Sequence, residues 1–315
     1  MGDKIATRAA YGDALVELGA RYPDLVVLDA DLSGSTMTKG FAKAYPQRFF
    51  NMGIAEGNMM SVAAGLAAAG KKAFANSFAM FAAGRAFEQV RNSIAYPRLN
   101  VTVVGSHGGL SVGEDGATHQ ACEDLAVMRA IPNMAVCCPC DGTEMKAAVK
   151  ALLDYDGPAY LRLGRSAVED LTGSLPGYAF QLGKGVTLRE GSDATVIAVG
   201  LMVQEAVKAA ETLAAQGVSL RVIDMHTIKP LDEALVLQAA RETGCVVTTE
   251  EHSVIGGLGS AVAEYLSGVC PVPVVRHGVE DLFGRSGKAA EVLAAYGLTA
   301  EGIADKVSAA LALKK

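Results

Sequence analysis

The sequence predicts an α/β protein built from two doubly wound domains. Short apolar runs of strand length alternate with helical patterns along most of the chain, which is typical of parallel sheets connected by crossover helices. A chain of 315 residues is long enough for two domains of ordinary size. Its 35 glycines allow helices and sheets to approach closely. We therefore expect two tightly layered units in succession.

The first predicted domain covers residues 1–170. A helix is expected at 5–21, before Pro23, and an alanine-rich helix at 55–69, where Gly70 is a stop signal. The apolar, strand-like runs of this domain lie at residues 25–29, 49–52, 100–104, 134–138 and 159–163. Together these segments predict a parallel sheet covered by helices.

The hydrophobic periodicity of helices and strands is lost at residues 171–190, a segment rich in glycine, serine and proline. We expect this segment to be a linker. The alternation resumes in a second, smaller domain at 191–315. Its strands are expected at 194–199, 220–223 and 245–249, and its helices at 202–216 and 231–242.

Composition argues against two classes of partner. The net charge is −6 and no basic block is present, so the sequence shows no electrostatic footprint for nucleic acid. The apolar runs are too short to span a bilayer, and the first residues lack the apolar stretch of a secretory signal. The expected location is therefore the cytoplasm, away from any membrane.

Six cysteines are present, and Cys137, Cys138 and Cys140 lie together in an apolar, strand-like segment. A zinc site would need a second pair of cysteines or histidines at ligand spacing, and none follows. Free cysteine is one of the most frequently buried residue types. We therefore expect buried thiols and no metal site on this chain.

Three polar loops, at residues 29–36, 53–58 and 105–120, follow strands of the first predicted domain. Ligands of open α/β sheets bind at the carboxyl ends of the strands, so these loops are expected to converge. Glu56, in the second loop, lies in the first turn of the alanine-rich helix, where the helix dipole alone explains a carboxylate. The small side chains of that helix also suit close packing against another subunit. A carboxylate at such a contact would be shielded from water and able to do acid–base chemistry.

The loop at 105–120 combines His107 and His119 with Glu114, Asp115 and five glycines. These are ordinary residues of a hydrated turn, but their clustering favours a ligand-binding loop. No nucleophile elbow, phosphate-binding loop or dinucleotide-binding spacing is present, and the glycine-rich run at 256–259 is interpreted as the start of a helix. The residues alone indicate an acid- and histidine-lined ligand loop and do not indicate a reaction.

Two segments carry a resemblance to a known family. They read Gly-Ile-Ala-Glu-Gly-Asn-Met at 53–59 and Gly-Glu-Asp-Gly-Ala-Thr-His-Gln at 113–120. In order and spacing both resemble the pyrimidine-binding domain of transketolase. The region from residue 194 onward, with Ile-Lys-Pro-Leu-Asp at 228–232, is similar to the family's C-terminal domain. The resemblance extends over essentially the whole chain.

The resemblance also implies what another chain would supply. Transketolases bind the diphosphate of thiamine diphosphate through Mg²⁺ in a separate domain with a Gly-Asp-Gly motif, which this sequence lacks. The chain therefore resembles the C-terminal subunit of a two-chain transketolase. This implies an N-terminal partner subunit that carries the diphosphate and Mg²⁺ ligands, an α2β2 heterotetramer, and sugar phosphate substrates.

The same resemblance implies roles for the matching residues. Glu56 would hydrogen-bond the ring nitrogen of the cofactor's aminopyrimidine, and a catalytic role is also implied for His107 and His119. The residues implied in cofactor binding are Glu56, Asp31, Phe78 and Phe81. The residues implied in substrate binding are Arg8, Ser35, His107, Asp115, His119 and Arg165. Arg162 competes with Arg165 for the phosphate, and a third aromatic found in some members is replaced near Gly84.

The implied activity is reversible transfer of a two-carbon ketol unit between sugar phosphates, as in pentose phosphate metabolism. Within the same cofactor class, a deoxyxylulose-phosphate synthase-like subunit and a 2-oxo-acid dehydrogenase β-type subunit stay open as alternatives. From a different class, a non-catalytic regulatory subunit stays open too.

Overall fold

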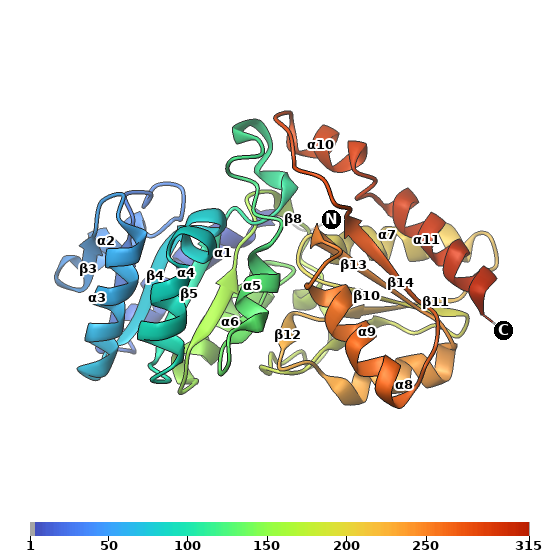
Figure 1. The fold of residues 1–315 in the computed structure, drawn as a ribbon, viewed down its shortest axis with the longest axis horizontal. Coiled ribbons are helices and arrows are strands. Elements are labelled where there is room, and N and C mark those ends of the chain that lie inside the picture. Colours follow the sequence, from blue (N-terminus) through green and yellow to red (C-terminus); the bar gives the residue numbers. More distant parts are fainter. Residues whose placement is uncertain (1–3, 315) are drawn as a thin grey trace.

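The computed structural model describes residues 4–314. Two mixed α/β units lie side by side, each with a central sheet between helices (Figure 1), as the sequence predicts. None of the helices within the described residues combines the length and apolar character that a bilayer crossing needs. Residues 1–3, on which the expected lack of a secretory signal partly rests, lie outside the described part of the chain.

The first sheet has seven strands in the order β12-β6-β7-β5-β4-β2-β3. Its strands are β2 (Leu25–Asp29), β3 (Phe49–Asn51), β4 (Lys72–Phe78), β5 (Val101–Ser106), β6 (Ala135–Cys137), β7 (Ala159–Arg162) and β12 (Thr227–Lys229). All neighbours are parallel except β12, which pairs antiparallel with β6. Because β12 comes from the second half of the chain, the two halves share this sheet.

Helices cover both faces of the first sheet. They are α1 (Thr7–Gly19), α2 (Lys39–Ala44), α3 (Glu56–Ala68), α4 (Phe87–Gln89), α5 (Asp124–Ala130) and α6 (Gly142–Asp154), with short helices η1 (Pro46–Arg48), η2 (Met80–Arg85), η3 (Val90–Ala95) and η4 (Leu110–Asp115) between them. Along β2, Leu25 and Val27 pack into the core with α1 and α6, whereas Val26 and Leu28 pack with α3. Successive strand residues point to opposite faces, and both faces are covered by helices, so β2 is apolar from Leu25 to Leu28.

The second sheet has the order β14-β13-β10-β11-β9. Its strands are β9 (Val186–Arg189), β10 (Ala194–Ala198), β11 (Leu220–Asp224), β13 (Val246–Ser253) and β14 (Val274–Val279), and its helices are α7 (Met202–Ala214), α8 (Glu233–Thr243), α9 (Leu258–Val269), α10 (Ala289–Ala295) and α11 (Ala300–Leu313). The strand β9 lies within the segment expected to be a linker and pairs antiparallel with β11. The segment at 256–259 leads into α9, which begins at Leu258 as expected.

The first helix begins later than the sequence indicates. Ile5 and Ala6 form β1, which pairs antiparallel with β8 (Ala167–Val168), so α1 starts at Thr7 and not at residue 5. The short helix η5 (Thr172–Ser174) then follows β8. The pairing brings the start of α1 beside the segment that follows β7, and Thr7 Oγ1 accepts a hydrogen bond of 2.8 Å from the Gly164 backbone.

Candidate functional site

The polar loops of the first unit meet at one edge of its sheet. Because β2, β3, β4, β5 and β7 run parallel, the segments that follow them leave the sheet on the same side. These segments contain Asp31 and Ser35, Glu56, Phe81, His107 to His119, and Arg165, in that strand order. Arg8 joins them from the start of α1. The expected convergence of the loops is therefore confirmed.

Glu56 lies in the first turn of α3, and its side chain is 1% exposed. Its Oε1 accepts a 3.1 Å hydrogen bond from Ser77 Oγ, at the end of β4, and its Oε2 accepts one of 2.9 Å from Arg85 Nη1. Position and burial agree with the expectation of a water-shielded carboxylate at the head of this helix. Neither Ser77 nor Arg85 was identified from the sequence.

Aromatic rings form a wall beside this carboxylate. The rings of Phe78 and Phe81 are stacked with centroids 6.1 Å apart. His119 meets both rings edge-on, at 6.0 and 5.3 Å, and Arg85 lies 4.6 Å above Phe81. Arg85 follows Phe81 by four residues, and this spacing is the sequence signal that could have revealed it. Arg85 therefore links the buried Glu56 to a cluster formed by the aromatic pair and His119.

His107 links the aromatic wall to the arginines. Its ring centroid lies 4.2 Å from that of Phe78, and its Nε2 lies 3.3 Å from Arg8 Nη1. A guanidinium can only donate, so Nε2 accepts and the ring proton sits on Nδ1, which faces Ser106 Oγ at 2.8 Å. Burial, followed by the positive charges of Arg8 and Arg165, lowers the pKa of His107 to about 3. The imidazole is therefore neutral at physiological pH.

Arg8 and Arg165 create a positive region next to His107. Arg8 Nη1 donates a 2.9 Å hydrogen bond to the backbone oxygen of Ser35. Burial and then the charge of Arg165 lower the pKa of Arg8. Arg165 donates to the Val112 carbonyl and, at 2.9 Å, to the exposed Glu114. Two guanidinium groups held this way suit a phosphate dianion, because each can offer paired N–H donors.

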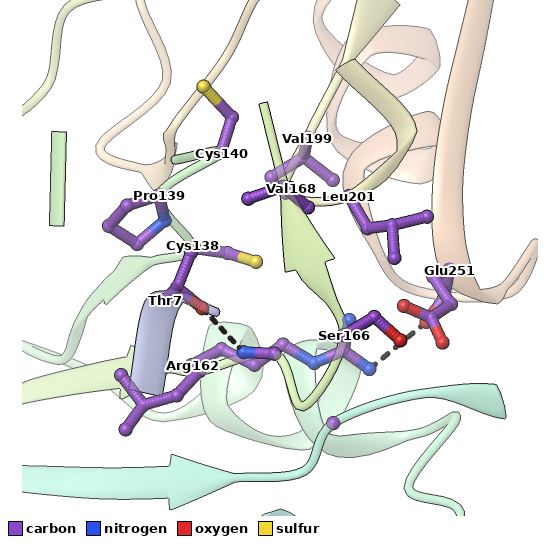
Figure 2. Close-up of a pocket in the computed structure, with 14 residues that line it drawn as sticks. Thr7, Cys138, Pro139, Cys140, Arg162, Ser166, Val168, Val199, Leu201 and Glu251 are labelled. Atoms are coloured by element: carbon purple, nitrogen blue, oxygen red, sulfur yellow. Dashed lines mark hydrogen bonds between the residues drawn. The ribbon is translucent and has the colours of Figure 1, made fainter. Parts of the chain in front are cut away.

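Arg162 is committed to the interior of the molecule. Its Nε donates at 2.9 Å to Asp124, and its Nη2 donates at 2.9 and 3.0 Å to the carbonyls of Ala121 and Glu251. Figure 2 shows its guanidinium directed toward Glu251 at the small cavity between the two units. Of the two arginines considered from the sequence, Arg162 is thus occupied and buried, and Arg165 is the one near Arg8 and His107.

Asp31 and Asp115 lie on the exposed side of these loops. Asp31 has a left-handed backbone with φ of 64°. It exchanges hydrogen bonds of 2.9 and 3.2 Å with Asn51, which ties the loop after β2 to the end of β3. The buried Asp29 holds the same loop, because its carboxylate accepts from Thr36 Oγ1 at 2.6 Å and Thr38 Oγ1 at 2.9 Å. Asp29 was not identified from the sequence as part of the site.

The cysteines of the apolar segment, Cys137, Cys138 and Cys140, are buried as predicted. Burial raises the pKa of the Cys138 thiol to about 12, so it stays protonated and unreactive. Cys140 lies with Glu144 and Asp224 in a buried group whose ligand atoms fall within 4.8 Å of one another. Burial raises the pKa of both carboxyls, and an adjoining pair of this kind is satisfied by one shared proton.

The residues at the sheet edge fit one part of a thiamine cofactor. A buried carboxylate beside a flat aromatic wall matches a planar ring with a hydrogen-bonding nitrogen. The diphosphate and its Mg²⁺ need several ionised oxygen ligands. The Cys140 group does not fit them, because it is sealed in the interior, where burial raises the pKa of its carboxyls and so disfavours their ionised form. The described residues therefore fit the aminopyrimidine half of the cofactor.

The two sheets, with a carboxylate, an aromatic wall and a cationic region at one sheet edge, define an α/β protein with a candidate ligand site at its strand ends. Residues 3–170 match the family model of the transketolase pyrimidine-binding domain, and residues 183–303 match that of the transketolase C-terminal domain.

Individual proteins show the same relationship over almost the whole chain. A protein described as a transketolase C-terminal section, from Methanocaldococcus jannaschii, is 51% identical and aligns over 95% of this chain and 94% of its own length. A 6-deoxy-6-sulfo-D-fructose transketolase subunit from a Clostridium species is 46% identical, with 94% and 91% covered. The structure of a split-gene transketolase, described as an inactive β4 tetramer, is 55% identical, with a TM-score of 0.92 and 99% and 100% covered. The chain belongs to the transketolase family, as a C-terminal subunit with the pyrimidine-binding and C-terminal domains.

Proposed function

We propose that this chain is the C-terminal subunit of a cytoplasmic two-chain transketolase that transfers a two-carbon ketol unit between sugar phosphates. The observation that carries the proposal is the buried Glu56 carboxylate next to the Phe78–Phe81 wall, with a cationic region that adjoins this wall through His107. A cofactor ring and a phosphorylated substrate can be held next to each other on such a surface.

When bound, thiamine diphosphate supplies the carbon nucleophile and the electron sink that break a carbon–carbon bond beside a ketone. Glu56 would share a proton with the ring nitrogen of the aminopyrimidine, and Phe78 and Phe81 would support the ring. Arg85 occupies one oxygen of this carboxylate, while Ser77 holds the other. These contacts fix the direction of the carboxylate before the cofactor arrives, which lowers the entropic cost of binding.

The substrate's phosphate would be held by Arg8 and Arg165, with Ser35 and His107 beside them. Because His107 is neutral, it adds hydrogen bonding to this subsite without adding charge. His119 lies against the aromatic wall. There it would meet both the cofactor ring and the substrate hydroxyls, to which Asp115 would also bind. In this arrangement His119 is the group best placed to move protons to and from the substrate.

The diphosphate and Mg²⁺ would be bound by an N-terminal partner subunit, in an α2β2 assembly. Two observations support this proposal. The described residues fit only the aminopyrimidine half of the cofactor, and the related split-gene transketolase was found inactive as a β4 tetramer. A partner chain could also cover the outer face of α3, because the small exposed side chains of this helix permit close packing against another subunit.

Reconstitution tests this proposal. The chain would be mixed with a partner that carries the Gly-Asp-Gly domain, together with thiamine diphosphate, Mg²⁺, xylulose 5-phosphate and ribose 5-phosphate. We expect two-carbon transfer only when both chains and both cofactor components are present. A partner that binds the chain tightly but gives no transfer with any phosphorylated ketose would contradict the proposal, and so would activity of this chain alone.

A further inference from the structure

The loop between β5 and α5, defined as residues 107–121, is here called the substrate loop. Its two ends are bonded to each other within the first domain. Gly109 donates a 2.8 Å hydrogen bond to the Ala121 carbonyl, and Gly108 forms an isolated parallel bridge with Ala121. The intervening residues include the exposed Asp115 and the half-buried His119. Closing the base of the loop in this way does not by itself position Asp115, which lies six residues from both Gly109 and Ala121.

A carboxylate from the second domain reaches into this loop. Glu251 lies on β13 and is 4% exposed. Its Oε1 accepts a hydrogen bond from the Ser111 backbone N–H in the first turn of η4. Gly109 has φ of 83°, and a Cβ there would lie 2.5 Å from the Glu251 carboxyl carbon. The glycine is therefore required both by its backbone conformation and by the close approach of this carboxylate.

Arg162 and β13 together hold the C-terminal end of the substrate loop. Arg162 Nη2 donates to the carbonyls of both Ala121 and Glu251, and its Nε is paired with Asp124. In addition, Ser253 N donates at 2.8 Å to the Cys122 carbonyl. The strand β13 is thus bonded close to both ends of the substrate loop.

A second segment of the C-terminal domain covers the outer part of the loop. Gln120 Nε2 donates at 3.0 Å to the Arg285 carbonyl and at 3.1 Å to the Leu110 carbonyl. A Cβ on Gly113 would lie 3.2 Å from backbone atoms of Gly287 and Ala289. Figure 1 shows the loop rising at the junction of the two units, beside the segment that leads into α10.

We propose that Glu251 is a positioning residue that sets the conformation of the substrate loop, and that the second domain takes part in the reaction by this route. The proposal rests on the proposed function for its kinetic consequence, whereas the structural consequence can be measured on the chain alone. Through Ser111, Glu251 fixes the turn that precedes Asp115 and His119, so the placement of both side chains depends on a residue of the other domain.

The neighbouring residue provides a matched control. Glu250 is also buried and also accepts backbone hydrogen bonds, but its oxygens bind Leu258 N and Gly259 N at 2.8 Å and cap α9. Its contacts stay within the second domain. Glu250→Ala and Glu251→Ala remove the same chemical group from adjacent positions, and only the second change should release the substrate loop.

The first measurement is amide hydrogen exchange of the chain alone. In Glu251→Ala we expect a specific loss of protection at residues 109–116. Glu251→Gln keeps an oxygen acceptor and should retain wild-type protection, whereas Glu251→Asp is one methylene shorter and should lose it. In Glu250→Ala, exchange should rise at the start of α9 instead. If Glu251→Ala proves insoluble, the comparison of Glu251→Asp with Glu251→Gln decides the matter.

The second measurement is kinetic and uses the two-chain enzyme. Misplacing reacting groups by about 1 Å costs roughly 10- to 100-fold, so Glu251→Asp should lower kcat/KM for the sugar phosphate by that factor. The Kd of thiamine diphosphate should change much less than kcat/KM, because Glu56, Phe78 and Phe81 are not touched. Glu251→Gln should restore kcat/KM, and Glu250→Ala should lower Tm while leaving kcat/KM at the wild-type value.

The outcomes separate this inference from the proposed function. If exchange at 109–116 is the same in wild-type, Glu251→Asp and Glu251→Ala chains, the positioning role is wrong, whatever the enzyme does. If the loop is released but kcat/KM is unchanged in an active two-chain enzyme, the link to the reaction is wrong. If no two-carbon transfer occurs even with the wild-type chain, the proposed function fails and the exchange result still stands.

Discussion

Glu56, His107 and Arg165 each reach the candidate site with a polar atom already bound by a neighbour. Side chains fixed in this way lose little further entropy when a ligand binds. Each is held by a particular arginine or loop residue: Arg85 donates a hydrogen bond to Glu56, and Arg8 donates one to His107. The chemistry of the surface therefore depends on pairs of residues and not on isolated ones.

Arg165 gives the most selective test of substrate binding. Arg165→Ala should raise KM for a phosphorylated ketose about tenfold or more, because charge-assisted hydrogen bonds to phosphate are lost. Steady-state kinetics of the two-chain enzyme would measure this, with an unphosphorylated ketose as a second substrate whose KM should not change. The matched control is Arg98→Ala, an exposed arginine that precedes β5 at the opposite edge of the sheet. An equal effect on both substrates would argue against a phosphate role.

His107 predicts how stability depends on pH. Its pKa of about 3 in the folded chain lies below the unfolded value of 6.5, so the folded state binds fewer protons. Its contribution to stability is complete above pH 6.5 and is lost as pH falls toward 3. Between pH 7 and pH 5 the free energy of unfolding should fall by about 2 kcal/mol more in the wild type than in His107→Asn. Urea titrations at both pH values would measure this. An equal fall in the free energy of unfolding for the wild type and His107→Asn would contradict it.

At the scale of elements, the helix α6 shows how one side chain organises a junction. Asp141 Oδ1 caps α6 by accepting from Glu144 N at 2.8 Å. Its Oδ2 accepts from the backbone N–H groups of Leu171 and Thr172, at 2.9 and 2.7 Å. A single buried carboxylate thus holds both the start of α6 and the segment that leaves the first domain.

Replacement of this cap should be unusually costly. Asp141→Ala leaves several buried N–H groups without partners, and we expect a loss of about 3 kcal/mol of unfolding free energy. Thr299→Ala, which removes a cap of α11 that serves one N–H group, should cost only about 1 kcal/mol. Chemical denaturation of both variants would compare them. Similar losses would mean that the additional contacts of Asp141 contribute nothing.

Elements with strong apolar or alanine-rich patterns could be predicted, and those specified by their surroundings could not. The runs at β2 and α3 were identified close to their observed bounds. The strand β4 was missed because Lys-Ala-Phe-Ala-Asn-Ser-Phe contains no β-branched residue. It is a strand because β2 and β5 flank it and because the buried Asn76 bonds to Tyr11 and to the Leu28 carbonyl. Tertiary contacts of this kind leave no periodic signal.

Site residues that are specified only by tertiary contacts could not be predicted from the sequence either. Glu56, the two phenylalanines and the histidines of the substrate loop belong to contiguous motifs, and a resemblance could identify them. Arg85 and Glu251 lie outside those motifs, and their roles come from contacts between distant segments. No spacing in the sequence shows that residue 251 reaches residue 111.

At the scale of the whole molecule, the two units are joined by more than a connecting segment. The strand β12 completes the first sheet, and Lys229 Nζ donates at 2.8 and 2.6 Å to the carbonyls of Arg129 and Ile131. Arg129 also forms a bidentate pair with Glu264 on α9, at 2.8 and 2.7 Å. These contacts lie across the same boundary as Glu251 and its loop.

We therefore expect the two sheets to unfold in one cooperative transition. Because the chain has no tryptophan, far-ultraviolet circular dichroism and hydrogen exchange of peptides from β5 and β13 are suitable probes. Under increasing denaturant, both peptides should lose protection at the same midpoint. Loss of protection in β13 well before β5 would show that the second domain opens independently.

We propose above all that Glu56 exchanges a proton with the pyrimidine ring of a thiamine cofactor held between two chains. The most direct test is the rate of hydrogen–deuterium exchange at the thiazolium C2 position of the cofactor in the two-chain complex. The wild-type complex should exchange this proton far faster than the free cofactor, and Glu56→Gln should slow the exchange by at least about 100-fold. An exchange rate that is unchanged in a correctly assembled Glu56→Gln complex would contradict the account.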